Sequence, residues 1–151
     1  MEFIIESPTI GKIATALSEA QKHIKPAKKN CKNPFHKSDY SDLAAIQEAC
    51  MPHLTEQGIS VTGRSVCDAG VWIYIGSLVH KESGEFFRTY LPLLLGKNDM
   101  QSLGSAQTYA ERYALKSLAG VATEDDDGQG AMPKQDTQQV QQQSTGLISH
   151  A

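Results

Sequence analysis

The sequence lacks the features that mark disulfide-rich, zinc-binding, membrane-spanning and secreted proteins. Its three cysteines, Cys31, Cys50 and Cys67, are odd in number and lack CxxC spacing, so neither a disulfide framework nor a zinc site is indicated. No apolar run approaches the roughly 20 residues that cross a bilayer. The first residues include acids where a signal peptide would carry positive charge. These absences predict a protein of a reducing cytoplasm.

The nucleotide-binding P-loop is missing as well. Gly96-Lys97 is followed by Asn98 rather than by serine or threonine, and no glycine precedes this pair at the required spacing. The sequence therefore predicts no nucleotide hydrolysis and no cofactor, and we expect the protein not to be an enzyme.

The net charge of −3 is distributed unevenly along the chain. Residues 1–123 hold 13 lysines and arginines against 12 acids, whereas residues 124–151 hold one lysine against five acids. Six lysines and no acid lie between positions 22 and 37. A polyanion-binding surface requires such segregation, although a charge run alone is more often a solvated loop.

The hydrophobic patterns predict an α+β fold, in which a small antiparallel β-sheet, a hairpin or meander, packs on a long C-terminal helix. Helices are expected over residues 8–24, 41–58 and 100–118, and strands over residues 59–62, 71–80 and 85–94. Ser7, Ser41 and Asp99 are the expected N-caps. We expect Pro52 to kink or split the second helix and Gly76 to mark a β-bulge.

Two segments outside these elements have distinct compositions. Residues 25–37 are rich in lysine and contain two prolines, which predicts an ordered loop or an extended arm. Residues 128–151 are Gln-rich and have little to bury, so they predict a disordered tail after a single domain over residues 1–127.

The last predicted helix has two different faces. Its expected core stripe is Met100, Leu103, Ala106, Ala110, Ala114 and Leu118, with Tyr113 at the edge. The opposite face carries a row of hydrogen-bond donors, Gln101, Ser105, Thr108, Arg112 and Lys116, with Tyr109 beside it. Such donors can bind phosphate oxygens, and tyrosine can stack on a base. A polar helix face is usually only solvated, but this row carries no carboxylate, since Glu111 falls on the flank.

The segment NPFHKSDYSDL, residues 33–43, is a second candidate surface. Phe35 and Tyr40 alternate with His36 and Lys37, the mixture of stacking surface and cation that single-stranded nucleic acid uses. The alternative is a hydrophobic staple at the entry to the second helix. The predicted DNA-binding residues of the lysine-rich segment and this surface are Lys28, Lys29, Lys32, Lys37 and Tyr40.

Three segments together resemble the Erf family of phage-encoded single-strand annealing proteins. They are NPFHKSDYSDLAAIQEA, SGEFFRTYLPL and QSLGSAQTYAERYALKSLAGVATEDDDG, in the family's order, within residues 10–128. The GSA-TYA-RY-L pattern and its acidic ending are the most specific part. The family's motif falls here on Gly104, Ser105, Thr108, Tyr109, Arg112 and Tyr113. Where the family often has a basic residue before the arginine, this chain has Glu111.

The resemblance implies a protein that binds single-stranded DNA and anneals complementary strands in phage recombination, independently of ATP. It implies homo-oligomeric rings or filaments and a core similar to other annealing recombinases, with a curved sheet packed on a long helix. The implied partners are single-stranded DNA, a phage exonuclease and the host single-strand-binding protein, in the cytoplasm of a bacterial host. Annealing requires no bond chemistry, only screened phosphates and accessible bases.

Two other functions stay open at this point. A passive single-strand-binding protein would need the same surface without annealing activity. A magnesium-dependent nuclease would use the acids at positions 124–127, with His36, His53 and His80 as further ligands. Two-metal sites need carboxylates that converge from different elements, whereas consecutive acids beside glycine point in different directions.

The acids at positions 124–127 lie just after the C-terminus of a predicted helix, where negative charge is unfavourable. Their position therefore indicates a role other than helix stability. We expect them to end the domain, and either to meet a basic patch on a neighbouring protomer or to keep the tail out of the DNA groove. A solubilising edge is the simpler alternative.

Overall fold

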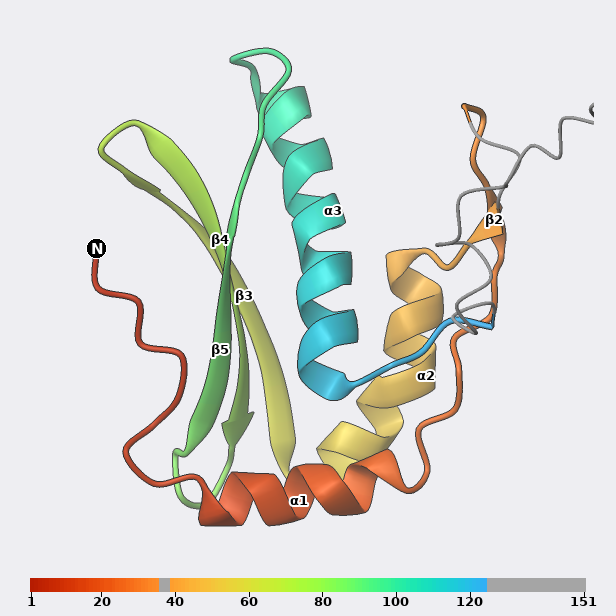
Figure 1. Ribbon diagram of the computed structural model, residues 1–151, viewed down its shortest axis with the longest axis vertical. Coiled ribbons are helices and arrows are strands. Elements are labelled where there is room, and N and C mark those ends of the chain that lie inside the picture. The colour runs from red at the N-terminus through yellow and green to blue at the C-terminus, as the bar shows by residue number, and fades with distance from the viewer. Residues whose placement is uncertain (36–38, 125–151) are drawn as a thin grey trace, which may run out of the picture.

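A three-stranded antiparallel sheet and one long helix form the centre of the structure (Figure 1). The computed structural model describes residues 1–35 and 39–124; the predicted tail and its boundary at residue 127 lie outside them. The elements of this centre are β3 (Ile59–Asp68), β4 (Val71–His80), β5 (Phe86–Pro92) and α3 (Met100–Ala119), with the strand order β3-β4-β5. This is the α+β architecture that the hydrophobic patterns predict.

Two further helices complete the core. Helix α2 (Leu43–Glu56) lies beside α3 on the side away from β5, and helix α1 (Gly11–Gln21) crosses beneath the sheet and α2 (Figure 1). Their inward faces meet the ends of the sheet and of α3 in one buried cluster, which includes Ile13, Ala20, Ile46, Cys50, Leu54, Ile59, Leu78, Leu115 and Ala119. Within the described residues, no helix is long and apolar enough to cross a membrane.

A small hairpin and the end of the described chain lie beyond α2. Strands β1 (Cys31–Lys32) and β2 (Asp39–Tyr40) pair in antiparallel register. We call residues 25–35 and 39–40 the arm. The arm is therefore ordered in the way that the lysine-rich segment predicts, with strand pairing that its sequence does not indicate.

Gly76 allows α3 to approach the sheet closely. Strand β4 pairs without interruption at this position, with Gly63 on one side and Thr89 on the other, so the predicted β-bulge is wrong. A Cβ atom placed on Gly76 would lie 2.9 Å from the Cβ atom of Ala114 in α3. The glycine and the buried alanines Ala110 and Ala114 thus meet a single requirement, the close packing of a helix on a strand.

Strand β3 extends to Asp68, well beyond its predicted end at residue 62. Gly63 breaks the apolar alternation in the sequence, but in the structure the ring of Tyr74 lies over this glycine and fills the place of a side chain. Burial raises the pKa of Tyr74 to about 12, and the charge of Glu111 contributes to the shift. Ala69 and Gly70, both with positive φ, form the tight turn into β4.

Of the N-caps predicted for the two later helices, that of α3 is confirmed and that of α2 is wrong. Asp99 caps α3 as expected, since its carboxylate accepts a first-turn N–H at 2.7 Å. Helix α2 is capped by Asp42 rather than by Ser41, whose buried hydroxyl donates instead to the carbonyl of Ala27. Helix α2 also continues through Pro52 as one helix, so of the two predicted outcomes the split is wrong, while the kink stays a prediction.

Helix α1 is shorter than predicted at both ends. Ser7 is not its N-cap, because the Ser7 hydroxyl accepts the N–H of Phe86 at 2.9 Å and holds this part of the chain extended along β5. The carboxylate of Glu85 caps the helix from another element, accepting the N–H of Ile13 at 2.8 Å. This bond and others to the same turn lower the pKa of Glu85. A cap supplied from a distant turn leaves no local signal in the sequence.

The predicted core stripe of α3 needs three changes, one of which is the addition of Ala119, which is fully buried. Met100 is 80% exposed and does not belong to it. Leu115, which the stripe omitted, is buried against α1 and α2. Because α3 packs on both the sheet and α2, its buried surface is wider than one stripe near its C-terminal end.

Substituting Gly76→Ala should lower the free energy of unfolding by about 1–3 kcal/mol, since the added methyl group overpacks a close helix–strand contact. Urea denaturation measures this loss. Gly104→Ala in α3 is the matched control, because no atom lies within 4 Å of a Cβ atom placed there. That control should be stabilised by up to about 1 kcal/mol. Equal loss in both variants would contradict the packing argument.

Candidate nucleic-acid interface

Arg112 lies among tyrosines from two elements. Its guanidinium carbon is 4.8 Å from the ring centroid of Tyr40 in β2, 5.1 Å from that of Tyr109 and 5.2 Å from that of Tyr113. Each such cation–π contact contributes about 0.5–1 kcal/mol at an exposed site. Among the described residues, no carboxylate forms an ion pair with Arg112. The rings therefore orient a guanidinium that no carboxylate of residues 1–35 and 39–124 contacts in an ion pair.

A pocket of about 220 Å³ lies between the arm and α3, and we call it the basic pocket. It is lined by Lys29, Asp39, Tyr40, Ser41, Ile46, Arg112, Tyr113, Lys116 and Thr123. Three of the predicted cations, Lys29, Arg112 and Lys116, thus meet here with the predicted Tyr40. The fold brings together two segments that the sequence separates widely.

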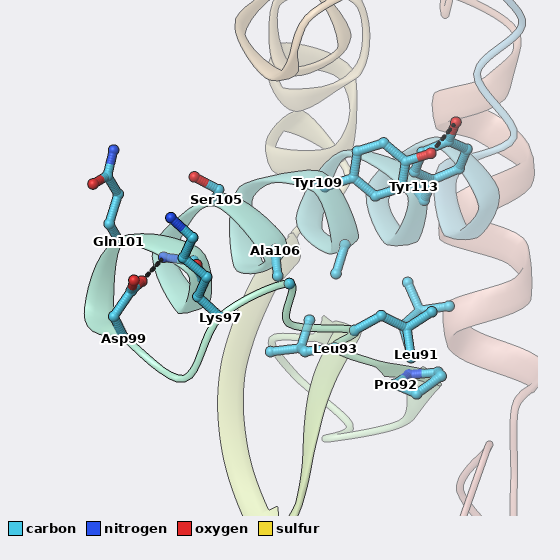
Figure 2. A pocket seen from close by; sticks show the side chains of 14 residues that line it. Leu91, Pro92, Leu93, Lys97, Asp99, Gln101, Ser105, Ala106, Tyr109 and Tyr113 are labelled. Carbon is cyan, nitrogen blue, oxygen red and sulfur yellow. Dashed lines mark hydrogen bonds between the residues drawn. The ribbon is translucent and has the colours of Figure 1, made fainter.

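Tyr109 and Tyr113 form a pair on the surface of α3 (Figure 2). Their ring centroids are 4.6 Å apart, and the Tyr109 hydroxyl donates to the Tyr113 hydroxyl at 3.1 Å. This bond lowers the pKa of Tyr113, helped by the charges of Arg112 and Lys116, and raises the pKa of Tyr109. Tyr113 is 45% exposed and belongs to this surface, although the sequence pattern predicted it at the core edge.

The predicted donor row divides along α3. Only Arg112 and Lys116 line the basic pocket, whereas Gln101 and Ser105 line a second pocket of about 810 Å³. This apolar groove, as we call it, lies between the end of β5 and the first half of α3 (Figure 2). Thr108 is exposed, and its hydroxyl donates to the Gly104 carbonyl at 3.1 Å. The row is therefore not one uniform phosphate-binding strip.

Comparison with known proteins decides the family. A model of the ERF superfamily matches residues 13–147, a span that contains every residue of the basic pocket. The chain belongs to the ERF superfamily. This match confirms the resemblance seen in the three sequence segments. Proteins of this superfamily anneal single strands in phage recombination and are not classical enzymes. Neither the curated proteins nor the solved structures gave a match.

The base of the arm is fixed to the N-terminus of α2 in this ERF chain. The Asn30 side-chain amide donates to the Asp42 carboxylate at 3.0 Å, and the Asp42 N–H donates to the Asn30 side-chain oxygen at 3.1 Å. The N–H of Ala45 contributes most to lowering the pKa of Asp42, followed by Asn30. The sequence pattern placed the N-cap one residue earlier, at Ser41, and nothing in it indicates that Asn30 would bind Asp42.

The other lysines of the arm do not line the basic pocket. Lys28 and Lys32 are exposed, and Lys32 lies opposite Asp39 in the hairpin. Lys37 and His36 lie outside the described residues. Lys28 and Lys32 are therefore surface charges outside the pocket lining, and a role of Lys28, Lys32 and Lys37 in DNA binding stays a prediction.

The acidic end of the domain begins against the basic arm of the same chain. Thr123 forms a parallel bridge with Ala27, whose N–H donates to the Ala122 carbonyl at 2.8 Å. The Glu124 carboxylate accepts the Lys29 N–H at 3.4 Å. The three following acids lie outside the described residues. Glu111, by contrast, lines a small pocket with Tyr74 on the sheet side of α3, off the donor row as predicted.

Of the histidines considered as metal ligands, the two that the structure describes, His53 and His80, lie in separate places. The His53 ring stacks on that of His23 with centroids 5.8 Å apart, and His80 bonds the Ser83 hydroxyl at 2.8 Å. Over residues 1–35 and 39–124, no three His, Cys, Asp or Glu side chains are grouped as metal ligands would be. His53 and His80 thus have local structural partners.

Substituting Tyr109→Phe should raise the pKa of Tyr113, because the phenolate of Tyr113 loses the hydroxyl that donates to it. NMR of ring-labelled tyrosine over an alkaline pH range measures this change. Tyr90→Phe is the control: the Tyr90 hydroxyl bonds the backbone of Ile4, so its removal should leave Tyr113 unchanged. An unaltered Tyr113 titration in Tyr109→Phe would contradict the hydroxyl pairing.

Proposed function

We propose that this ERF protein binds single-stranded DNA at the basic pocket and anneals complementary strands without nucleotide hydrolysis, as a homo-oligomeric ring or filament. The observation that supports the proposal is the convergence of Lys29, Arg112 and Lys116 with Tyr40 in one pocket. Cations and stacking rings in one trough are what sequence-independent binding of a single strand requires. The place of action is the cytoplasm of a bacterial host, beside a phage exonuclease and the host single-strand-binding protein.

Each group has a separate part in this proposal. Arg112 offers a planar fork of N–H donors that matches two phosphate oxygens, and its three tyrosine contacts hold the fork in place. Lys29 and Lys116 add point charges on either side of the pocket. The exposed ring of Tyr109 supplies a face on which any base can stack.

The proposed contacts leave base-pairing edges available. Phosphate and stacking contacts carry no sequence information and do not occupy the edges through which bases pair. Cations that neutralise phosphates also reduce the repulsion between two approaching strands. A protein that holds strands in this way lowers the barrier to annealing without any bond chemistry.

Substituting Arg112→Ala should weaken binding of all single-stranded sequences alike, and should reduce the slope of log affinity against log salt by about 0.7, the value for one phosphate contact on a single strand. Fluorescence anisotropy with oligonucleotides of several sequences at a series of salt concentrations measures both effects. Arg64→Ala is the matched control, since Arg64 is exposed on β3 and does not line the pocket. An unchanged salt slope in Arg112→Ala would remove Arg112 from the site.

Annealing can be distinguished from the two alternatives in one reaction scheme. The protein should accelerate pairing of complementary labelled oligonucleotides in the absence of ATP. The acceleration by the Arg112→Ala variant should be smaller by more than about 10-fold, the order of magnitude expected for a lost phosphate contact. Tight binding without acceleration would favour a passive binding protein. Strand cleavage with Mg²⁺ or Mn²⁺ that disappears in Asp126→Ala would favour a nuclease.

A further inference from the structure

The apolar groove continues directly from the basic pocket. Tyr113 lines both, and Tyr109 beside it lines the groove. The guanidinium carbon of Arg112 is 5.1 Å from the ring centroid of Tyr109 and 5.2 Å from that of Tyr113. A nucleotide whose phosphate binds Arg112 therefore has these two rings, and the adjoining end of the groove, within reach of its base.

The charges of the groove disfavour the backbone of a nucleic acid along most of its length. Lys97 is the single cation among the groove's lining residues, and Asp99 lies at the same end (Figure 2). The Asp99 carboxylate accepts the Ser102 N–H at 2.7 Å, which lowers the pKa of Asp99 and leaves it negatively charged at neutral pH. A phosphate needs cations, so the backbone of a strand is favoured at the basic pocket and not beyond it.

The walls of the groove suit the flat, largely apolar faces of a nucleobase. One wall is formed by residues 91–94 at the end of β5, where Leu94 is 86% exposed. The facing surface of α3 carries the small side chains of Ala106 and Ala110. The volume of about 810 Å³ falls within the range of about 300–1,000 Å³ that small-molecule sites occupy. Small residues on the helix thus leave a space that a planar ring can enter.

Gln101 and Ser105 supply polar groups on the α3 side of the same groove. Both were predicted to bind phosphate, but they line the groove rather than the basic pocket. A glutamine amide and a serine hydroxyl each donate and accept hydrogen bonds, so they can bond the edge of any of the four bases. The division of the predicted donor row then matches the two parts of a nucleotide, with its cations at one pocket and these neutral polar groups at the other.

We propose that the apolar groove is a base-binding subsite, which takes one nucleobase of the strand whose phosphate Arg112 binds. The base passes the rings of Tyr109 and Tyr113 and enters between β5 and α3, while its phosphate stays in the basic pocket. The inference deepens the proposed function and rests on it, because it assigns a place for a base beside the phosphate site. The neighbouring bases stay outside the groove and keep their pairing edges free.

A base that occupies the groove is not available to a second strand at the same time. The groove therefore contributes to the affinity for a single strand and not to the affinity for a duplex, and the held base leaves when two strands pair. This distinguishes the substrate of annealing from its product by geometry rather than by sequence.

The test combines protein variants with different oligonucleotides, and anisotropy of the labelled oligonucleotide measures the binding by the full chain. Ser105→Leu fills part of the groove, and Leu94→Gln makes its wall polar. Each should weaken binding of a single strand by about 10-fold, the magnitude of one lost stacked base. The salt slope should stay unchanged, because no phosphate contact is removed. An oligonucleotide of the same length whose sugars lack bases should bind these variants and the wild type alike, and so should a duplex.

Two matched controls carry the same substitutions outside the groove. Ser117→Leu changes an exposed residue of the same helix, and Val71→Gln changes an apolar residue that is 51% exposed at the start of β4. Neither residue lines the groove or the basic pocket. Both controls should bind single strands as the wild type does. Urea denaturation confirms that all four variants are folded.

The remaining outcomes overturn the inference, and they separate it from the proposed function. Groove variants that bind single strands as tightly as the wild type, while Arg112→Ala still reduces the salt slope, would remove the base subsite and leave the basic pocket. An equal loss for the base-free oligonucleotide, or a reduced salt slope in Ser105→Leu, would mean that the groove acts on the backbone instead. Failure of the wild type to bind any strand would remove the proposed function and the subsite with it.

Discussion

The close packing of α3 on β4 is the contact on which the rest of the molecule depends. Gly76 and Ala114 leave no room for a larger side chain between helix and strand, so they fix how α3 is rotated about its axis. That rotation turns Arg112 and Lys116 toward the arm and Glu111 toward the sheet. The chemistry of the candidate site is therefore set by small residues that never touch a ligand.

The second half of the site depends on contacts that tie the arm to the domain. Asn30 and Asp42 bind each other by two hydrogen bonds, and Ala27 is held both by Ser41 and by the chain that follows α3. These bonds use backbone groups and short polar side chains, which leaves the long lysine side chains outside the anchor. An arm fixed in this way can present cations and a tyrosine to α3 without a large apolar core of its own.

The sequence permits good prediction of elements whose determinants are local. The cap of α3 by Asp99 and the strand of β4 follow from patterns within a few residues, and the family motif lies on one helix. Three other features depend on residues that come together only after folding. They are the full length of β3, the cap of α1 by Glu85 and the pairing of Asn30 with Asp42. The same reason explains the candidate site: the sequence predicts its two candidate surfaces, but which of their side chains share one pocket, and the exclusion of Gln101 and Ser105 from it, follow from tertiary structure alone.

The position of the acids shows why a chain with a net charge of −3 can still offer a surface to a polyanion. At an ionic strength near that of a cell, charges interact strongly only within about 8–10 Å, so local arrangement matters more than net charge. Glu124 binds a backbone N–H of the arm rather than a lysine ammonium group, and Asp42 is held by Ala45 and Asn30. Glu124 and Asp42 thus stabilise the backbone that shapes the basic pocket. Their hydrogen bonds lie with peptide and amide groups, and in the described part of the chain no carboxylate forms an ion pair with Arg112.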